Sequence, residues 1–124
     1  MTLRNIPFEG QASVAVYLND ARDSFLGFDP AQAQLRLVAR FTIPAPRDAR
    51  AAMGALEDVY VQLNVGGELV EPCAYTVDYR AAGHRSLSVG DVVVIGETAF
   101  AVARFGFDPV GAAALSVALA SVAS

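Results

Sequence analysis

Apolar and polar residues alternate in two segments of the N-terminal half, and a period of two predicts strands. In residues 13–19 the alternation places three aliphatic side chains on one face, those of Val14, Val16 and Leu18. Residues 35–43 repeat it, with a single apolar face composed of Leu35, Leu37, Ala39, Phe41 and Ile43. Residues 20–33 keep no period, which indicates a loop between the two strands.

A period near 3.6 residues replaces this alternation in residues 48–64 and predicts an amphipathic helix. The Asp48 carboxylate can accept hydrogen bonds from the free amides of the first helical turn. Apolar side chains then recur at spacings of three and four, at Met53, Leu56, Tyr60 and Leu63. Gly66 and Gly67 supply a left-handed stop. We expect this helix to be the main one packed on the sheet.

Residues 92–95 are four β-branched residues in succession, which suits a strand buried on both faces. A second apolar segment, residues 98–105, follows after Gly96 and Glu97. Glycine at the first of two linking residues suits a type II′ turn. The sequence therefore predicts a β-hairpin at the centre of the sheet.

Two other segments give shorter signals. Tyr75, Val77 and Tyr79 alternate with other residues, which predicts a short strand. Residues 1–12 have no period and contain both proline and glycine, so we expect an arm or an edge strand there.

The chain ends in an uncharged, apolar segment, residues 109–124. Asp108 as the cap and Pro109 at the first helical position predict a helix start, with a strand over residues 116–119 as the alternative. Apolar side chains fall on one face of this helix, at Leu115, Leu119 and Val122. Because small apolar residues surround the helix, we expect it to pack on the sheet and to supply a homo-oligomer interface through that face.

Together these elements predict an α+β fold, with a small mixed or antiparallel sheet, one main helix at about residues 48–64 and a C-terminal helix. A chain of 124 residues fits one domain, residues 1–124. Hydrophobic residues make up 54% of the chain and charged residues only 18%. Such a chain has little polar surface, so either its core is unusually complete or another copy or protein covers apolar surface.

The formal net charge of -4 argues against nucleic acid as a partner, because binding to a phosphate backbone depends on clustered cations. No apolar run reaches the roughly 18 to 20 residues that span a bilayer, and the first residues lack the apolar core of a signal peptide. We therefore expect no membrane association and a cytoplasmic location.

The chain contains one cysteine, Cys73, and one histidine, His84, which excludes the usual zinc patterns. Lysine is absent, so there is no phosphate-binding loop of the glycine-rich type that ends in lysine. We expect no metal, no cofactor and no catalytic residue. A small hydrolase in which His84 is the base for Ser86, Ser88 or Cys73 is the alternative.

Residues 85–93 read Arg-Ser-Leu-Ser-Val-Gly-Asp-Val-Val, between a helix that ends in residues 59–64 and a downstream Phe100. This segment resembles the YodL-like group of small bacterial proteins. The resemblance implies an origin in a plasmid, phage or integrated conjugative element, near antirestriction modules. The group has no established activity, so the resemblance assigns no catalytic residue.

The same segment has two interpretations. In the structural one, Ser86 and Ser88 bond to nearby backbone groups, Gly90 adopts a positive φ, and Asp91 closes the turn before the buried strand. In the functional one, the segment is an exposed recognition loop. That loop would comprise His84, Arg85, Ser86, Ser88 and Asp91.

With the context that this resemblance implies, we expect a non-enzymatic accessory or interaction protein of a mobile element, with a host or element-encoded protein as its partner. A protein that inhibits a host restriction or other defence enzyme, presenting carboxylates in place of phosphates, is the alternative. A net charge of -4 is modest for such a phosphate mimic.

Overall fold

The structure is a computed structural model that describes residues 10–64 and 73–123, and for residues 121–123 it describes the backbone alone. Its strands are β1 (Gln11–Asn19), β2 (Leu35–Pro44), β3 (Val92–Ile95), β4 (Thr98–Val102) and β5 (Phe107–Val110). Its helices are α1 (Ala49–Gln62), α2 (Ala74–Ala81) and α3 (Ala112–Ala123), with a short 3-10 helix, η1 (Ser24–Leu26). The predicted α+β class is confirmed. Residues 1–9 of the predicted N-terminal arm lie outside the described residues.

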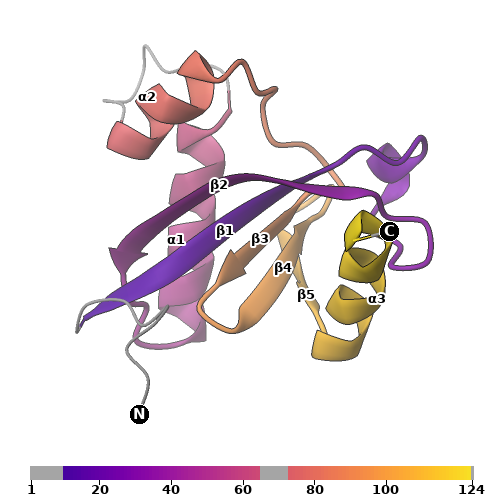
Figure 1. Cartoon of the computed structure of the whole chain (residues 1–124). Coiled ribbons are helices and arrows are strands. Elements are labelled where there is room, and N and C mark those ends of the chain that lie inside the picture. The colour runs from indigo at the N-terminus through magenta and orange to yellow at the C-terminus, as the bar shows by residue number, and fades with distance from the viewer. Residues whose placement is uncertain (1–9, 65–72, 124) are drawn as a thin grey trace.

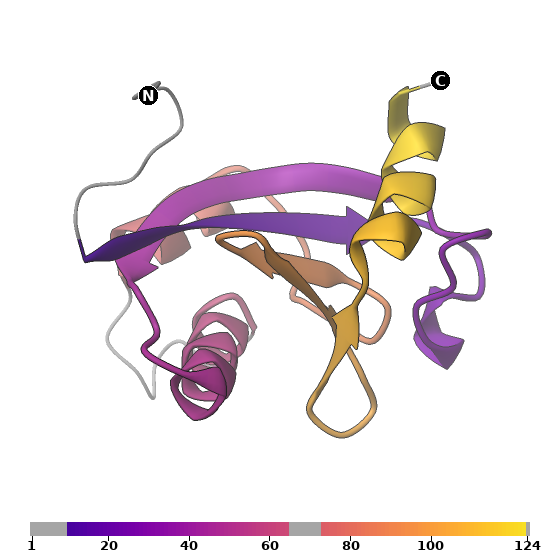
Figure 2. The same cartoon turned by 90° about the horizontal axis from the view of Figure 1, so that it is seen from below.

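The five strands form one sheet in the order β2-β1-β3-β4-β5, and every neighbouring pair is antiparallel. Figures 1 and 2 show β3, β4 and β5 between α1 and α3. The side chains of α1 and α2 join a first apolar cluster with Val14, Val16 and Leu18 of β1. Those of α3 join a second cluster with Leu35 and Val92. The helices thus cover opposite faces of the sheet.

Helix α1 agrees closely with the predicted helix. The amide of Ala51 donates to Oδ1 of Asp48 at 2.8 Å, which is the expected cap. Leu56 and Leu63 are buried in the first cluster, and Met53 and Tyr60 pack against it. The predicted glycine stop lies outside the described residues.

The predicted hairpin is also confirmed, with β3 as the central strand of the sheet. Val93 and Ile95 belong to the first cluster and Val92 to the second, so β3 is buried on both faces. Gly96 has a φ of +62°, the positive value that its turn requires. The second strand ends at Val102 rather than at residue 105, because the amide of Ala103 donates to the carbonyl of Gly106 in a new turn.

The prediction of a strand at Tyr75, Val77 and Tyr79 is wrong, since these residues lie in helix α2. Tyr75 and Tyr79 are four residues apart, so one helical face holds both, and a period of two fits them equally well. The two tyrosines are partly or fully buried, whereas Val77 is exposed. Burial of alternate side chains therefore does not occur here.

The predicted helix start at Asp108 and Pro109 is wrong, although the C-terminal helix itself is confirmed. Both residues lie in β5, where Pro109 pairs with Phe100 at the edge of the sheet. An edge strand tolerates proline, because an amide directed away from the sheet has no partner to lose. Helix α3 begins only at Ala112.

Strand β2 does not present one continuous apolar face. Its register with β1 shifts between Val16, which pairs with Ala39, and Tyr17, which pairs with Leu37. Val38 is therefore the extra residue of a β-bulge, which reverses the side-chain alternation along the strand. Leu35 consequently packs in the second cluster, whereas Ala39, Phe41 and Ile43 pack against the first.

Among the described residues, no helix combines the length and apolar character that a membrane span requires.

Candidate functional site

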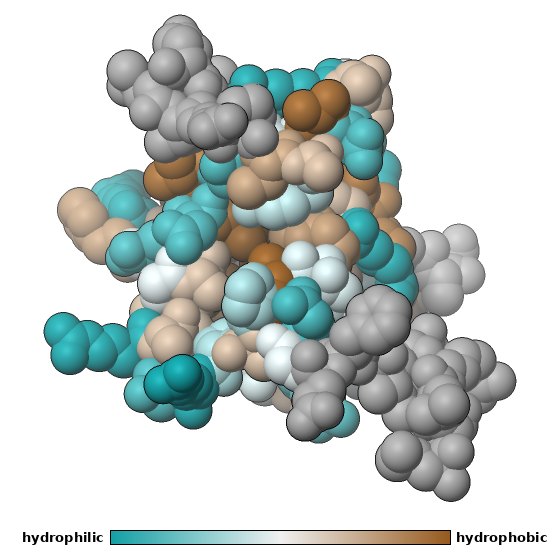
Figure 3. Space-filling model, turned by 90° about the vertical axis from the view of Figure 1, so that its left-hand side faces the viewer, coloured by the Kyte–Doolittle hydropathy of each residue, from teal (hydrophilic) through white to brown (hydrophobic). Residues whose placement is uncertain are grey.

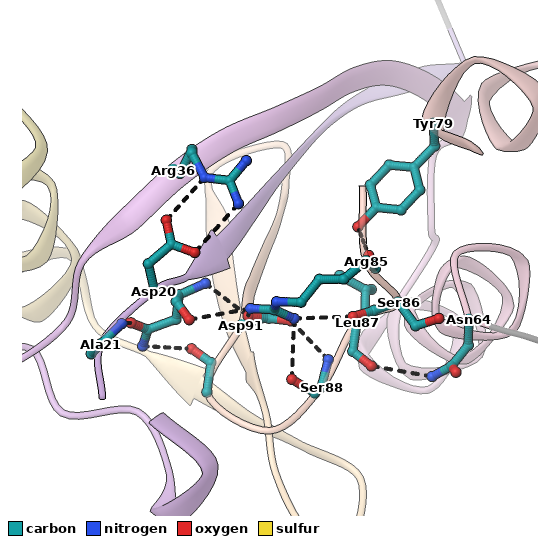
Figure 4. Close-up of polar contacts among 12 residues, drawn as sticks. Asp20, Ala21, Arg36, Asn64, Tyr79, Arg85, Ser86, Leu87, Ser88 and Asp91 are labelled. Atoms are coloured by element: carbon teal, nitrogen blue, oxygen red, sulfur yellow. Dashed lines mark hydrogen bonds and ion pairs between the residues drawn. The ribbon is translucent and has the colours of Figure 1, made fainter. Parts of the chain in front are cut away.

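The segment that carries the family resemblance holds a buried carboxylate. Asp91, which directly precedes β3, has no exposed surface. The two terminal nitrogens of Arg85 donate to its two oxygens, each at 2.8 Å. The amides of Ser88 and Asn19 donate to the same carboxylate at 2.7 and 2.8 Å. Figure 4 shows these groups converging, and a bidentate pair with added amide donors is the arrangement that makes a buried charge tolerable.

Asn19 extends this arrangement across the molecule. Its side-chain amide donates to the carbonyl of Gly90 at 3.0 Å, and its Oδ1 accepts from the amides of Ala21 and Gln34. Arg85 also donates to the carbonyl of Asn19 at 3.2 Å. We call the set formed by Asn19, Arg85, Ser88 and Asp91 the polar network. It joins the end of β1 to the start of β3.

Two further contacts surround the polar network. Arg36 donates to both oxygens of Asp20, at 2.9 and 3.3 Å, and this hydrogen bonding holds the pKa of Asp20 below its ordinary value. The hydroxyl of Tyr79 donates to the carbonyl of Arg85 at 2.5 Å. Burial, assisted by the negative charge of Asp91, raises the pKa of Tyr79 to about 12. Tyr79 therefore remains a neutral donor at physiological pH.

The five residues of the predicted recognition loop are brought together, but their two charged groups pair with each other, with Asp91 buried and the Arg85 side chain 40% exposed. Arg85 and Asp91 pair with each other, and the Ser88 hydroxyl accepts a further hydrogen bond from Arg85 at 3.2 Å. The Ser86 carbonyl accepts from Arg85 at 3.0 Å. His84 lies against the ring of Tyr79, with centroids 5.1 Å apart. Asp91 in particular is buried, so it cannot form part of an exposed recognition surface.

Gly90 fits the structural interpretation of the segment. Its φ is +94°, and a Cβ atom at this position would lie 2.4 Å from the carbonyl oxygen of Ser24. The backbone of the 85–93 segment thus packs directly against η1. Because Asn19 also donates to the Gly90 carbonyl, the polar network holds the segment against which η1 packs.

We expect Gly90→Ala to destabilise the protein more than a matched substitution at Gly83. Gly83 has a φ of +80° but nothing within 4 Å of an added Cβ, so Gly83→Ala should cost only about 1 kcal/mol for the left-handed backbone. At Gly90 the overlap with Ser24 should add at least about 1 kcal/mol. Urea unfolding of both variants measures the difference, and equal losses would contradict the close packing.

Helix η1 and the β4–β5 turn carry the most exposed apolar side chains among the described residues. Phe25 is 63% exposed, Leu26 71% and Phe105 90%. Phe25 and Leu26 line a hollow of about 270 Å³ together with Ala103 and Arg104, which directly precede Phe105. Phe105 itself does not line the hollow but follows the two residues that do. We call Phe25, Leu26 and Phe105 the apolar rim. The sequence did not indicate it, because an apolar residue in a loop gives no sign of whether it is buried.

The opposite end of the sheet holds a wider hollow of about 1100 Å³ between the end of β2 and α1. Its lining includes Ile43, Ala55 and Tyr75, and Figure 3 shows apolar side chains gathered in the middle of this face. The low charge content of the chain thus corresponds to apolar surface at both ends of the sheet.

The predicted oligomer face of α3 turns toward the sheet. Leu115 and Leu119 pack against the second cluster beside the buried Ala118. The side chain of Val122 lies outside the described residues. The outer face of α3 carries Val117, which is 55% exposed. If α3 forms an interface, Val117 and its neighbours would form it rather than the leucines.

Comparisons with protein-family models, with curated proteins and with solved structures give no significant match to this chain. Among the described residues, no cluster of histidine, cysteine or carboxylate side chains is arranged to hold a metal ion.

Proposed function

We propose that this chain is a non-enzymatic interaction protein of a bacterial mobile element, related to the YodL-like group, that binds a protein partner in the cytoplasm through the apolar rim. The observation that carries the proposal is the rim itself, in which two phenylalanines and a leucine are 63 to 90% exposed. Phenylalanine is among the residues enriched in the core of protein interfaces relative to the rest of a protein surface.

The polar network supports this proposal because it gives the rim a rigid base. Binding residues work best on segments that are already ordered, since less conformational entropy is then lost on association. Gly90 packs on Ser24, the first residue of η1, and Asn19 holds Gly90 from the other side. In this proposal the segment shared with the YodL-like group is the support of the binding surface rather than the surface itself.

The shape and charge around the rim favour a protein partner. The hollow at the rim, about 270 Å³, is smaller than the usual pocket for a small molecule. Asp108 and Arg104 both line it, and Asp23 and Arg22 are exposed next to η1, so the surface combines apolar anchors with charges of both signs. A complementary partner presents an apolar cleft bordered by charges of both signs.

The two carboxylates beside the rim keep the inhibitor of a host defence enzyme as a second candidate. The DNA-binding surface of a nuclease is basic, and Asp23 and Asp108 could occupy positions that phosphates take there. In that case a nuclease assay with purified restriction enzyme would show inhibition that Asp108→Asn weakens.

The function is tested by affinity capture from host lysate with three baits: the wild type, the double variant Leu26→Ser/Phe105→Ser, and the control Val117→Ser. We expect a partner that the wild type and the control retain and the double variant loses. All three baits should unfold at similar urea concentrations, because the changed side chains are exposed. A partner captured equally by all three baits would refute the role of the rim.

Self-association through the apolar tail is a separate part of the proposal. We propose that the outer face of α3, rather than its leucine face, forms the contact between two copies. Light scattering on the wild type and on Val117→Glu tests it. A dimer that the glutamate disrupts would support the proposal, and a wild type that remains monomeric at all concentrations would end it.

A further inference from the structure

Among the described residues, β2 pairs only with β1, so no described strand lies along its other edge. Figure 2 shows it as the outermost strand of the sheet. The register identifies which of its backbone groups point outward. The carbonyl of Ser13 accepts from Gly96 on the β3 side, so the groups of Val14 and Val16 point toward β2 and bond to Phe41 and Ala39.

It follows that Arg40 and Thr42 direct their amides and carbonyls away from β1. Beyond the bulge, Leu37 does the same, because its pairing partner Tyr17 points toward β3. These outward groups form no hydrogen bond with any described residue. All three side chains are also exposed, Leu37 by 41%. An array of unpaired, exposed backbone groups is what an additional strand satisfies.

Two of these residues, Arg40 and Thr42, border a hollow beside the edge. It measures about 430 Å³ and is lined by Tyr17, Arg40, Thr42 and Leu115. Tyr75 of α2 stacks on Phe41 from the opposite face, with ring centroids 3.8 Å apart, so α2 does not fill this hollow. Alternate side chains of an added strand could therefore enter it, which is how edge-strand sites obtain specificity.

We propose that the free edge of β2, at Leu37, Arg40 and Thr42, binds an extended acidic segment of a partner protein as a sixth strand. The proposal rests on the proposed function and names a second contact for the same kind of partner. Arg40 forms no ion pair with another described residue, so its charge is available for a carboxylate on the added strand. An apolar side chain two positions along that strand would enter the hollow beside Tyr17 and Leu115.

A second copy of this chain is a poorer occupant than an acidic segment. Antiparallel pairing that matches the outward groups of two β2 strands centres on Phe41 and places Arg40 of one copy opposite Thr42 of the other. Arg40 then faces no carboxylate, whereas an acidic segment supplies one. The bulge at Val38 also interrupts the regular edge that such pairing needs.

The test selects binders from a displayed library of random peptides of about 12 residues, twice the usual strand length. We expect the enriched peptides to alternate apolar and acidic residues and to bind Arg40→Glu about tenfold more weakly than the wild type. The control Arg50→Glu makes the same charge change at an exposed position on α1 and should bind like the wild type. Bound peptide should slow amide exchange at Leu37, Arg40 and Thr42.

Failure to enrich any peptide overturns the inference, and so does enrichment of peptides that bind Arg40→Glu with full affinity or protect other amides. A wild type that dimerises by itself, and an Arg40→Glu variant that is monomeric, would assign the edge to a second copy instead.

The rim variant Leu26→Ser/Phe105→Ser separates the two proposals. If it loses the lysate partner while no peptide is enriched on β2, the proposed function stands and the β2 site fails. If peptides bind the edge but no lysate partner depends on the rim, the β2 site stands and the proposed function through the rim fails.

Discussion

Replacing Arg85 with Met is expected to lower the free energy of unfolding by about 2 to 3 kcal/mol, less than the roughly 3 to 5 kcal/mol for a fully buried ion pair, because the Arg85 side chain is 40% exposed. Asp91 has no exposed surface and receives two of its hydrogen bonds from Arg85. Without the guanidinium, the amides of Ser88 and Asn19 are left to compensate for the carboxylate. Urea unfolding monitored by circular dichroism gives the loss as a shift of the midpoint at constant slope.

Two matched variants identify the cause of this loss. Arg85→Lys keeps the charge but cannot form the fork of two parallel hydrogen bonds, so it should fall between the wild type and Arg85→Met. Arg36→Met breaks the exposed pair with Asp20 and should have a much smaller effect. Equal losses of unfolding free energy in Arg36→Met and Arg85→Met would show that the burial of Asp91 does not increase the effect of losing its arginine.

Local periodicity was sufficient for the elements whose burial follows one simple pattern. Residues 13–19, the helix after Asp48 and the hairpin at Gly96 form as predicted, because in each the apolar side chains face the core at a constant period. The failures occur where a pattern fits two structures. Tyr75 and Tyr79 satisfy both a strand and a helix, and the order Asp108, Pro109 suits both a helix start and an edge strand.

The bulge in β2 is a failure of another kind. Leu35 and Ala39 appear to share one face in the sequence, yet they lie in different clusters. An extra residue in a strand is a property of its pairing with a neighbour, and the alternation of a single strand carries no information about it. The same feature shapes the edge that we propose as a binding site.

The candidate site was predictable only in its local parts. The positive φ of Gly90 and the turn closed by Asp91 follow from residue type, and both occur. The bond between Asn19 and Asp91 joins residues 72 positions apart, and no sequence motif connects them. The apolar rim was missed for the opposite reason, since Phe25 and Phe105 look like core residues and only the tertiary structure leaves them exposed.

These placements separate the residues that should affect stability from those that should affect binding. Arg85 and Gly90 belong to the segment against which η1 packs, whereas Leu26 and Phe105 are exposed and contribute little to the core. Conservative changes at the polar network should therefore reduce stability and binding together. Changes at the rim should reduce binding alone, which is the signature that distinguishes a supported interaction surface from an ordinary loop.

Leu56→Ala provides the reference for how strongly the sheet and α1 depend on each other. Leu56 is fully buried in the first cluster among Val14, Val16 and Leu18 of β1, so its truncation should leave a cavity and cost about 3 to 5 kcal/mol. Val61→Ala is the matched control on the same helix, because Val61 is 45% exposed and alanine is the better helix former. Urea midpoints of both variants measure the contrast. A midpoint unchanged by Leu56→Ala would mean that α1 does not pack on the sheet through this face, and the first cluster would then have to be reassigned.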